Sequence, residues 1–170
     1  MHNSLGLLGL LLAGVCQLAA ARTPGEVPVG GVLRNASMQG ISVPSKRLSD
    51  FQGKPLVINV WASWCGPCRQ EMGSLERLSR RYGGKQFNVI GISTDDYRDR
   101  AQAFVKQFHI TFNNFIDHEL FLENMLGADR LPLTLLVDAQ GKVLDKRYGA
   151  WEWDSPEALT LLEKTFRIKL

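Results

Sequence analysis

Two cysteines separated by two residues are the side chains of this sequence best suited to chemistry. Cys65 and Cys68 flank Gly66 and Pro67 within the run WCGPC at residues 64–68. At the start of a helix, unpaired backbone N–H groups and the helix dipole stabilise a thiolate, which is the nucleophile of disulfide exchange. Pro67 suits a first helical turn because a backbone N–H has no partner there. The spacing predicts a redox pair in which Cys65 attacks and Cys68 resolves the mixed disulfide.

Zinc binding and a purely structural crosslink are the other uses of such a pair. Zinc takes four ligands, often from two pairs, whereas this chain has only 3 Cys, and Cys16 lies in an apolar N-terminal segment. His109 and His118 lie far along the chain from the pair. The position at a predicted helix start favours redox chemistry over a structural disulfide. We therefore expect no metal site, and no cofactor other than the cysteine pair itself.

The cysteine pair lies between a predicted strand and a predicted helix. Residues 55–61 form a continuous apolar run, which is typical of a strand buried on both faces. From residue 67 to 82 apolar residues such as Met72 recur at helical spacing, and two glycines follow. This pattern predicts a buried strand that leads directly into an amphipathic helix.

The rest of the chain alternates predicted strands and helices. Strands are expected at residues 87–93, 112–116, 133–137 and 143–148, and helices near 101–108, near 119–126 and from 154 onward. Upstream, short pieces around Val32 and Ile41, separated by Gln39 and Gly40, predict a small β-hairpin ahead of the main fold. The order of elements predicts an α/β fold with a central mixed sheet flanked by helices.

Length and composition are those of one ordinary globular domain. The chain has 170 residues, of which 45% are hydrophobic and 22% charged, so disordered, collagen-like and coiled-coil classes are excluded. The formal net charge is only +3, and basic residues are interspersed with acidic ones. No basic run indicates nucleic acid or an anionic membrane as a partner.

The first residues are predicted to be a signal peptide. The apolar run from Leu5 to Ala20 is shorter than the roughly 20 apolar residues that a bilayer crossing needs, and it ends in a small-residue cleavage site. An uncleaved membrane anchor is the alternative. The expected organisation is residues 1–21 as signal peptide, 22–31 as a lead-in and 32–170 as the folded domain. Export decides the redox compartment in which the cysteines work.

The tryptophans fall at informative positions. Trp61 ends the predicted buried strand and is expected in the core, while Trp64 is expected to screen the disulfide from water. Trp151 and Trp153 alternate just before the last helix, so both lie on one side of the chain and at least one is expected to be packed. A partner surface is the alternative for this second pair.

At these motifs the sequence resembles the thioredoxin superfamily, and more narrowly the exported thioredoxin-like proteins of the TlpA and ResA type. The resemblance covers the chain from about Leu33 to the C-terminus. It rests on LSDFQGKP at residues 48–55, NVWASWCGPC at 59–68, LPLT at 131–134 and VDAQGK at 137–142. It implies a thioredoxin-like fold with an N-terminal β-hairpin extension, and the activity of a protein thiol–disulfide oxidoreductase.

The resemblance also implies roles for single residues. Pro132 matches a cis-proline that faces the disulfide, and the backbone of Leu131 would pair with an extended substrate. Glu71 matches an acidic residue that tunes the pKa of the cysteines; a solvated glutamate in the first helical turn is the alternative. Asn59 stands where ordinary thioredoxins carry a buried aspartate, and the exported group often has asparagine there.

By the same resemblance, the protein would be a monomeric reductant of protein disulfides in the bacterial periplasm, or anchored to the inner membrane facing it. A membrane thiol electron donor would recharge it, and apocytochrome c or a copper-delivery protein are possible clients. Two alternatives stay open: an oxidant that introduces disulfides, and a copper- or haem-binding module without redox turnover. Such modules typically carry CxxxC and a later His, whereas here the spacing is CxxC, and His109 and His118 precede Pro132.

Overall fold

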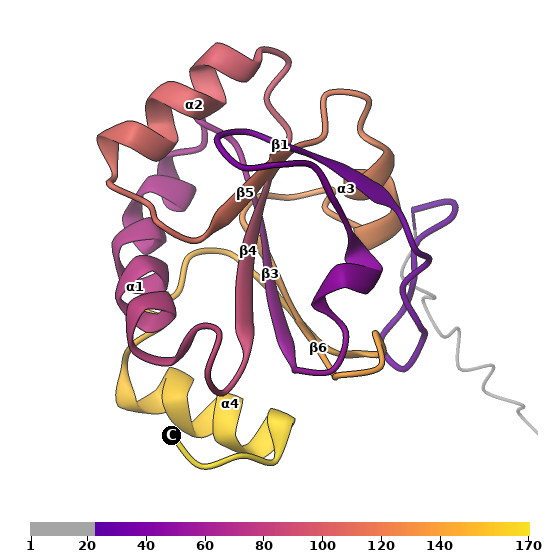
Figure 1. Cartoon of the computed structure of the whole chain (residues 1–170), viewed down its shortest axis with the longest axis vertical. Coiled ribbons are helices and arrows are strands. Elements are labelled where there is room, and N and C mark those ends of the chain that lie inside the picture. The colour runs from indigo at the N-terminus through magenta and orange to yellow at the C-terminus, as the bar shows by residue number, and fades with distance from the viewer. Residues whose placement is uncertain (1–22) are drawn as a thin grey trace, which may run out of the picture.

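The computed structural model describes residues 23–170, so the predicted signal peptide lies outside the described residues. In this part of the chain, no helix has both the length and the apolar character needed to cross a bilayer. The elements follow the predicted alternation (Figure 1). In chain order they are β1 Ser37–Gly40, β2 Lys46–Arg47, the 3-10 helix η1 Leu48–Phe51, β3 Leu56–Trp61, α1 Gly66–Tyr82, β4 Asn88–Ser93, α2 Arg98–Gln107, β5 Asn113–Ile116, α3 Phe121–Leu126, β6 Leu133–Val137, β7 Val143–Tyr148 and α4 Pro156–Phe166.

The strands form one mixed sheet in the order β2-β1-β5-β4-β3-β6-β7. The pairs β3–β4 and β4–β5 are parallel, and the other pairs are antiparallel. Every residue of β3 is buried, because this strand has neighbours on both edges and helices over both faces. The continuous apolar run that predicted a doubly covered strand is therefore confirmed.

Two hydrophobic cores lie on opposite faces of the sheet. Helices α1, α2 and α4 cover one face, while α3 and η1 cover the other (Figure 1). Successive side chains of β3 alternate between the cores, as the period of a strand requires: Val57 and Trp61 belong to the first core, and Ile58 and Val60 to the second. By the same alternation, Asn59 points toward α1 from within an apolar strand.

The N-terminal hairpin exists, but not at the predicted residues. It is made by β1 and β2, whereas the pieces around Val32 and Ile41 had been expected to form it. Gly40 ends β1 because the chain turns back sharply there, and a Cβ atom at this position would lie 1.8 Å from the Val43 carbonyl oxygen. Strand β1 also pairs with β5, so the hairpin is an edge of the main sheet rather than a separate preceding unit.

The lead-in packs against the domain. The backbone N–H of the buried Val27 donates to the Met125 carbonyl over 2.9 Å, which ties this segment to α3. Glu26 forms an ion pair with Lys146 of β7 at 2.5 Å, and Lys146 also donates to the Leu126 carbonyl over 2.7 Å. Both charged side chains are largely buried, so the segment completes the second core rather than serving as a linker.

The Gly91 position of β4 provides a test of core packing. An added Cβ atom would lie 1.9 Å from Asn114 Oδ1 and 2.7 Å from Trp61 Nε1, two atoms joined by a 3.0 Å hydrogen bond. We expect Gly91→Ala to lower the free energy of unfolding by about 2 kcal/mol, because overpacking a buried site forces neighbours out of place. The control is Gly73→Ala in α1, where the nearest atom, of Arg77, is 3.4 Å away.

The control variant should be as stable as the wild type or up to about 1 kcal/mol more stable, because alanine favours a helix over glycine. Urea unfolding of each protein with its disulfide intact gives both values. Equal stabilities for Gly91→Ala and the wild type would contradict the packing described for this face of the sheet.

Candidate active site

A disulfide joins Cys65 and Cys68 at the start of α1, with an S–S distance of 2.11 Å. Cys65 is the residue that caps the helix, and its sulfur accepts a hydrogen bond from the Cys68 backbone N–H at 3.2 Å. Cys65 has 4% of its surface exposed to solvent, whereas Cys68 is fully buried. The predicted strand-to-helix placement is confirmed, and Cys65 is the one of the two cysteines that keeps some exposed surface.

Cys65 lines a surface groove of about 760 Å³. Segments that are distant in sequence form its walls: the turn that carries the cysteines, the loop after β4, and the stretch from the start of α3 to β6. Trp64 stands beside Cys65 in this wall with 68% of its surface exposed. Its ring is therefore available to a substrate. Its predicted screening of the disulfide stays a prediction.

Polar contacts fix the turn ahead of the cysteines. The buried Asp95 carboxylate accepts from the Ser63 backbone N–H at 2.9 Å, from the Ser63 hydroxyl at 2.6 Å and from the Ser93 hydroxyl at 2.7 Å. Arg69 of α1 donates to the Ser63 carbonyl at 2.8 Å. Helix α2 starts after Tyr97 without a side-chain cap, so Asp95 serves the turn at Ser63 rather than the start of that helix. No pattern in the sequence predicted the contact between Asp95 and Ser63.

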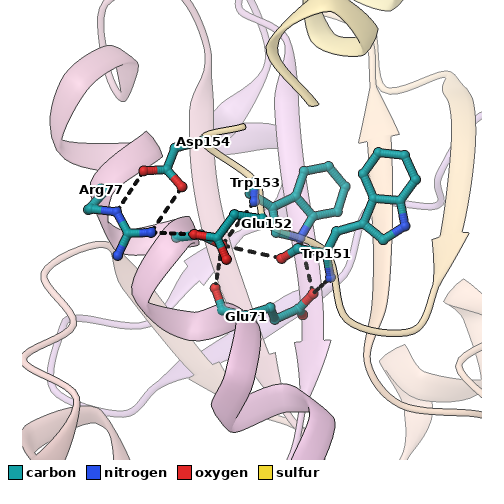
Figure 2. Close-up of polar contacts among 7 residues, drawn as sticks. Glu71, Arg77, Trp151, Glu152, Trp153 and Asp154 are labelled. Atoms are coloured by element: carbon teal, nitrogen blue, oxygen red, sulfur yellow. Dashed lines mark hydrogen bonds and ion pairs between the residues drawn. The ribbon is translucent and has the colours of Figure 1, made fainter. Parts of the chain in front are cut away.

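Glu71 is buried in α1, with 1% of its surface exposed. Its Oε1 accepts from Asn59 Nδ2 at 2.7 Å, and its Oε2 accepts from the Trp151 backbone N–H and from Trp153 Nε1, each at 3.1 Å (Figure 2). The alternative of a solvated glutamate is therefore wrong. Asn59 also donates to the Thr134 hydroxyl at 3.0 Å, so the two predicted supporting residues meet in one network.

Burial raises the pKa of Glu71 from its ordinary value of 4.5 to about 7, against the opposing effect of its three hydrogen bonds. Among the described residues, the Asn59 carbonyl oxygen is the one fully buried side-chain polar atom without a partner. Glu71 follows Cys68 by three residues on α1, and residues at this separation lie on the same helix face. A carboxyl group with a raised pKa thus shares a helix face with the buried cysteine.

Residues 151–154 form a strap against α1, and Figure 2 shows it together with Glu71 and Arg77 of that helix. The fully buried Trp153 donates its backbone N–H to the Ser74 hydroxyl at 2.9 Å. On the outer side, Arg77 pairs with Glu152 at 2.5 Å and with Asp154 at 2.6 Å (Figure 2). The strap supplies two of the three donors to Glu71, a role that sequence analysis missed, although the Trp-x-Trp alternation marked the segment.

The peptide bond between Leu131 and Pro132 is cis, as the resemblance implied. Leu131 lines the groove together with Cys65, and the buried Pro132 carbonyl accepts from the Gly149 N–H at 2.9 Å. The fold thus brings the predicted substrate-facing backbone and the predicted attacking cysteine to the same surface.

Residues 23–170 contain no group of three or more His, Cys, Asp or Glu side chains placed to hold a metal ion. His109 and His118 each line a separate surface pocket, and neither lines the groove of Cys65. The structure therefore does not bring the histidines to the cysteine pair.

The raised pKa of Glu71 predicts a pH-dependent stability. Between pH 4.5 and 7 the folded protein binds a proton that the unfolded chain releases, so wild-type stability should fall as the pH rises through this window. The loss should reach up to about 3 kcal/mol. Glu71→Gln removes the titrating group, so its stability should fall less. Urea unfolding at pH 5 and pH 8 measures the difference.

The matched control is Glu157→Gln, which removes an exposed carboxylate in the first turn of α4. This variant should keep the wild-type change in stability between the two pH values. If Glu71→Gln loses as much stability as the wild type over this range, the carboxyl of Glu71 does not titrate there.

Comparisons with known proteins agree with this geometry. The sequence profile of the Redoxin family matches residues 38–162. The chain is 29% identical over 117 residues to the thiol-disulfide oxidoreductase ResA of Geobacillus thermodenitrificans, covering 69% of this chain and 67% of that protein. It is 31% identical over 120 residues to the thioredoxin-like protein YneN of Bacillus subtilis, covering 66% and 67% of the two chains.

Among solved structures, a protein from Chlorobium tepidum described as the thiol:disulfide interchange protein DsbE superposes with a TM-score of 0.72. The two are 27% identical, and the match covers 82% of this chain and 96% of the other. This likeness confirms the predicted thioredoxin-like fold. The chain therefore belongs to the Redoxin family, as a ResA-like thiol–disulfide oxidoreductase of the thioredoxin superfamily.

Proposed function

We propose that this protein works as a monomeric, exported reductant that transfers electrons from its cysteine pair to disulfides of protein substrates in the periplasm. The observation that carries the proposal is the unequal burial of the pair: Cys65 opens into a groove, and Cys68 is enclosed behind it. This arrangement allows one sulfur to exchange with a substrate and keeps the other for the second step. A membrane thiol donor would regenerate the reduced pair.

The reaction proceeds by two thiol–disulfide exchanges. The Cys65 thiolate attacks one sulfur of a substrate disulfide, forms a mixed disulfide and releases the other substrate sulfur as a thiolate. The Cys68 thiolate then attacks the Cys65 sulfur, which releases the second substrate thiolate and closes the Cys65–Cys68 disulfide. The substrate gains two electrons and the pair loses two.

The surrounding residues have separate tasks in these steps. The start of α1 stabilises the Cys65 thiolate through its unpaired N–H groups and dipole, and Pro67 keeps that first turn helical without an unpaired donor. The cis bond before Pro132 presents the Leu131 backbone to an extended substrate. Glu71 accepts the proton of the Cys68 thiol when the mixed disulfide is resolved, because its pKa of about 7 suits proton exchange near neutral pH.

The residues between the cysteines support this direction of electron flow. Gly66 and Pro67 are those of thioredoxin, whose reduction potential is about −270 mV. The predicted clients, apocytochrome c and copper-delivery proteins, require such a reductant. An oxidant that introduces disulfides and a copper-binding module without turnover are the other candidates.

The reduction potential of the pair tests the direction. Equilibration of the purified protein in defined thiol buffers should give a value near the −270 mV of thioredoxin. A value near the −120 mV of the strong periplasmic oxidant DsbA would make the protein a disulfide donor instead. Tight copper binding to a pair that does not reduce a protein disulfide would favour the binding module.

The order of the two cysteines is tested by single substitutions. Cys68→Ser should trap mixed disulfides with a disulfide-bonded protein such as insulin, because the resolving thiol is gone, while Cys65→Ser should trap none. Both variants should lose multiple-turnover reduction of insulin. Non-reducing electrophoresis detects the trapped species. Trapping by Cys65→Ser alone would reverse the assignment of the attacking and resolving sulfurs.

A further inference from the structure

The groove beside Cys65 has a charge opposite to that of the whole chain. Three carboxylates line it, Asp96, Glu123 and Asp129, against a single guanidinium, Arg130. The chain as a whole carries a formal net charge of +3. Within residues 23–170, none of the three carboxylates has a cationic side chain within 4.0 Å. The groove is therefore locally anionic and keeps its carboxylates uncompensated.

Two neighbouring side chains, Arg130 and Asp117, leave these carboxylates without a balancing positive charge. Arg130 places its guanidinium 4.9 Å from the ring centre of Tyr148, so it stacks on β7 instead of pairing with an acid. Glu123 is partly buried, and its pKa is raised by that burial and by the nearby charge of Asp117. A cation that enters the groove would favour the charged form of Glu123 and so oppose both effects.

A strained residue adds an apolar contact to the same groove. Leu120, which precedes α3, has a left-handed backbone with φ 57° and ψ 23°, a conformation that costs a non-glycine residue about 1 kcal/mol or more. Its side chain is nevertheless 36% exposed and lines the groove, as does the 68% exposed Trp64. The turn that holds this backbone is closed by the Leu120 N–H, which donates to the Asp117 carbonyl at 3.0 Å, and it leaves part of the leucine side chain facing the groove.

We propose that this groove selects its substrates: it binds an extended polypeptide in which the disulfide-bonded cysteine is accompanied by a bulky apolar residue and by a lysine or arginine. Leu120 and Trp64 contact the apolar side chain, and the carboxylates of Asp96, Glu123 and Asp129 attract the cation. The inference rests on the proposed function, because it concerns substrates of the same cysteine pair.

The two kinds of contact act at different stages of binding. An anionic groove raises the association rate of a cationic segment, and this effect weakens as salt screens the charges. Burial of an apolar side chain against Leu120 and Trp64 lowers the dissociation rate instead. A substrate with an acidic residue in place of the cation would meet like charge at the groove.

The electrostatic part is tested with two synthetic peptides that contain the same disulfide and leucine, and that differ only in a lysine or a glutamate next to the cysteine. Each rate of reduction by the reduced protein is divided by the rate for hydroxyethyl disulfide, a small neutral probe. We expect a lysine-to-glutamate preference of about tenfold at low salt, which falls toward unity at high salt. Asp96→Asn combined with Asp129→Asn should remove most of it.

Glu157→Gln is the charge control, because this exposed carboxylate of α4 does not line the groove. It should leave the preference unchanged. Equal normalised rates for the two peptides, with hydroxyethyl disulfide still reduced, would overturn the inference and leave the proposed function intact. Failure to reduce hydroxyethyl disulfide and both peptides would instead contradict the proposed function.

The apolar part is tested by Leu120→Gly. Glycine adopts a positive φ without strain, so the urea midpoint should stay within the wild-type range or rise. KM for the leucine-containing peptide should nevertheless rise about fivefold, because the apolar contact is lost. The control is Phe121→Ala: this neighbour is 54% exposed but lines a different pocket. A lower midpoint with an unchanged KM would show that Leu120 serves the fold and would overturn its assigned role.

Discussion

The complete burial of β3 is the constraint on which the rest of the structure depends. Its residues contact helices on both faces and strands on both edges, so neither its register nor its end can shift without exposing one of the two cores. The chain must therefore leave the sheet after Trp61 and start α1 within a few residues. That short connection places Cys65 at the cap of α1 and Cys68 inside its first turn.

The same strand places a polar group where the site needs one. Asn59 is buried among apolar neighbours, and its amide donates to Glu71 and Thr134. Burying a carboxyl group costs free energy unless the group is hydrogen-bonded or neutral. Glu71 accepts three hydrogen bonds, and its pKa is raised to about 7, which favours the neutral form. The strap of residues 151–154 keeps water away from this carboxyl while supplying two of the donors. A carboxyl group with a raised pKa is thereby held on the same face of α1 as the buried Cys68.

Much of this could be read from the sequence because it depends on local patterns. The apolar run of β3, the helical spacing of α1, the CxxC pair and the proline at residue 132 each lie within short segments whose chemistry is specific. The hairpin was placed wrongly because short alternating pieces carry little information about register, which the pairing of β1 with β5 decides. Likewise, a glutamate near the start of a helix, such as Glu71, has the same sequence pattern whether it is solvated or buried.

By itself, the sequence determined the fold class and the position of the cysteine pair at a helix start. The tertiary structure alone decided that Trp151 and Trp153 bind Glu71, that Asp95 fixes the turn at Ser63, and that the groove of Cys65 is anionic. These features join segments far apart along the chain. Their contacts depend on how helices and loops pack against the sheet, and periodicity within a single segment carries no information about that packing.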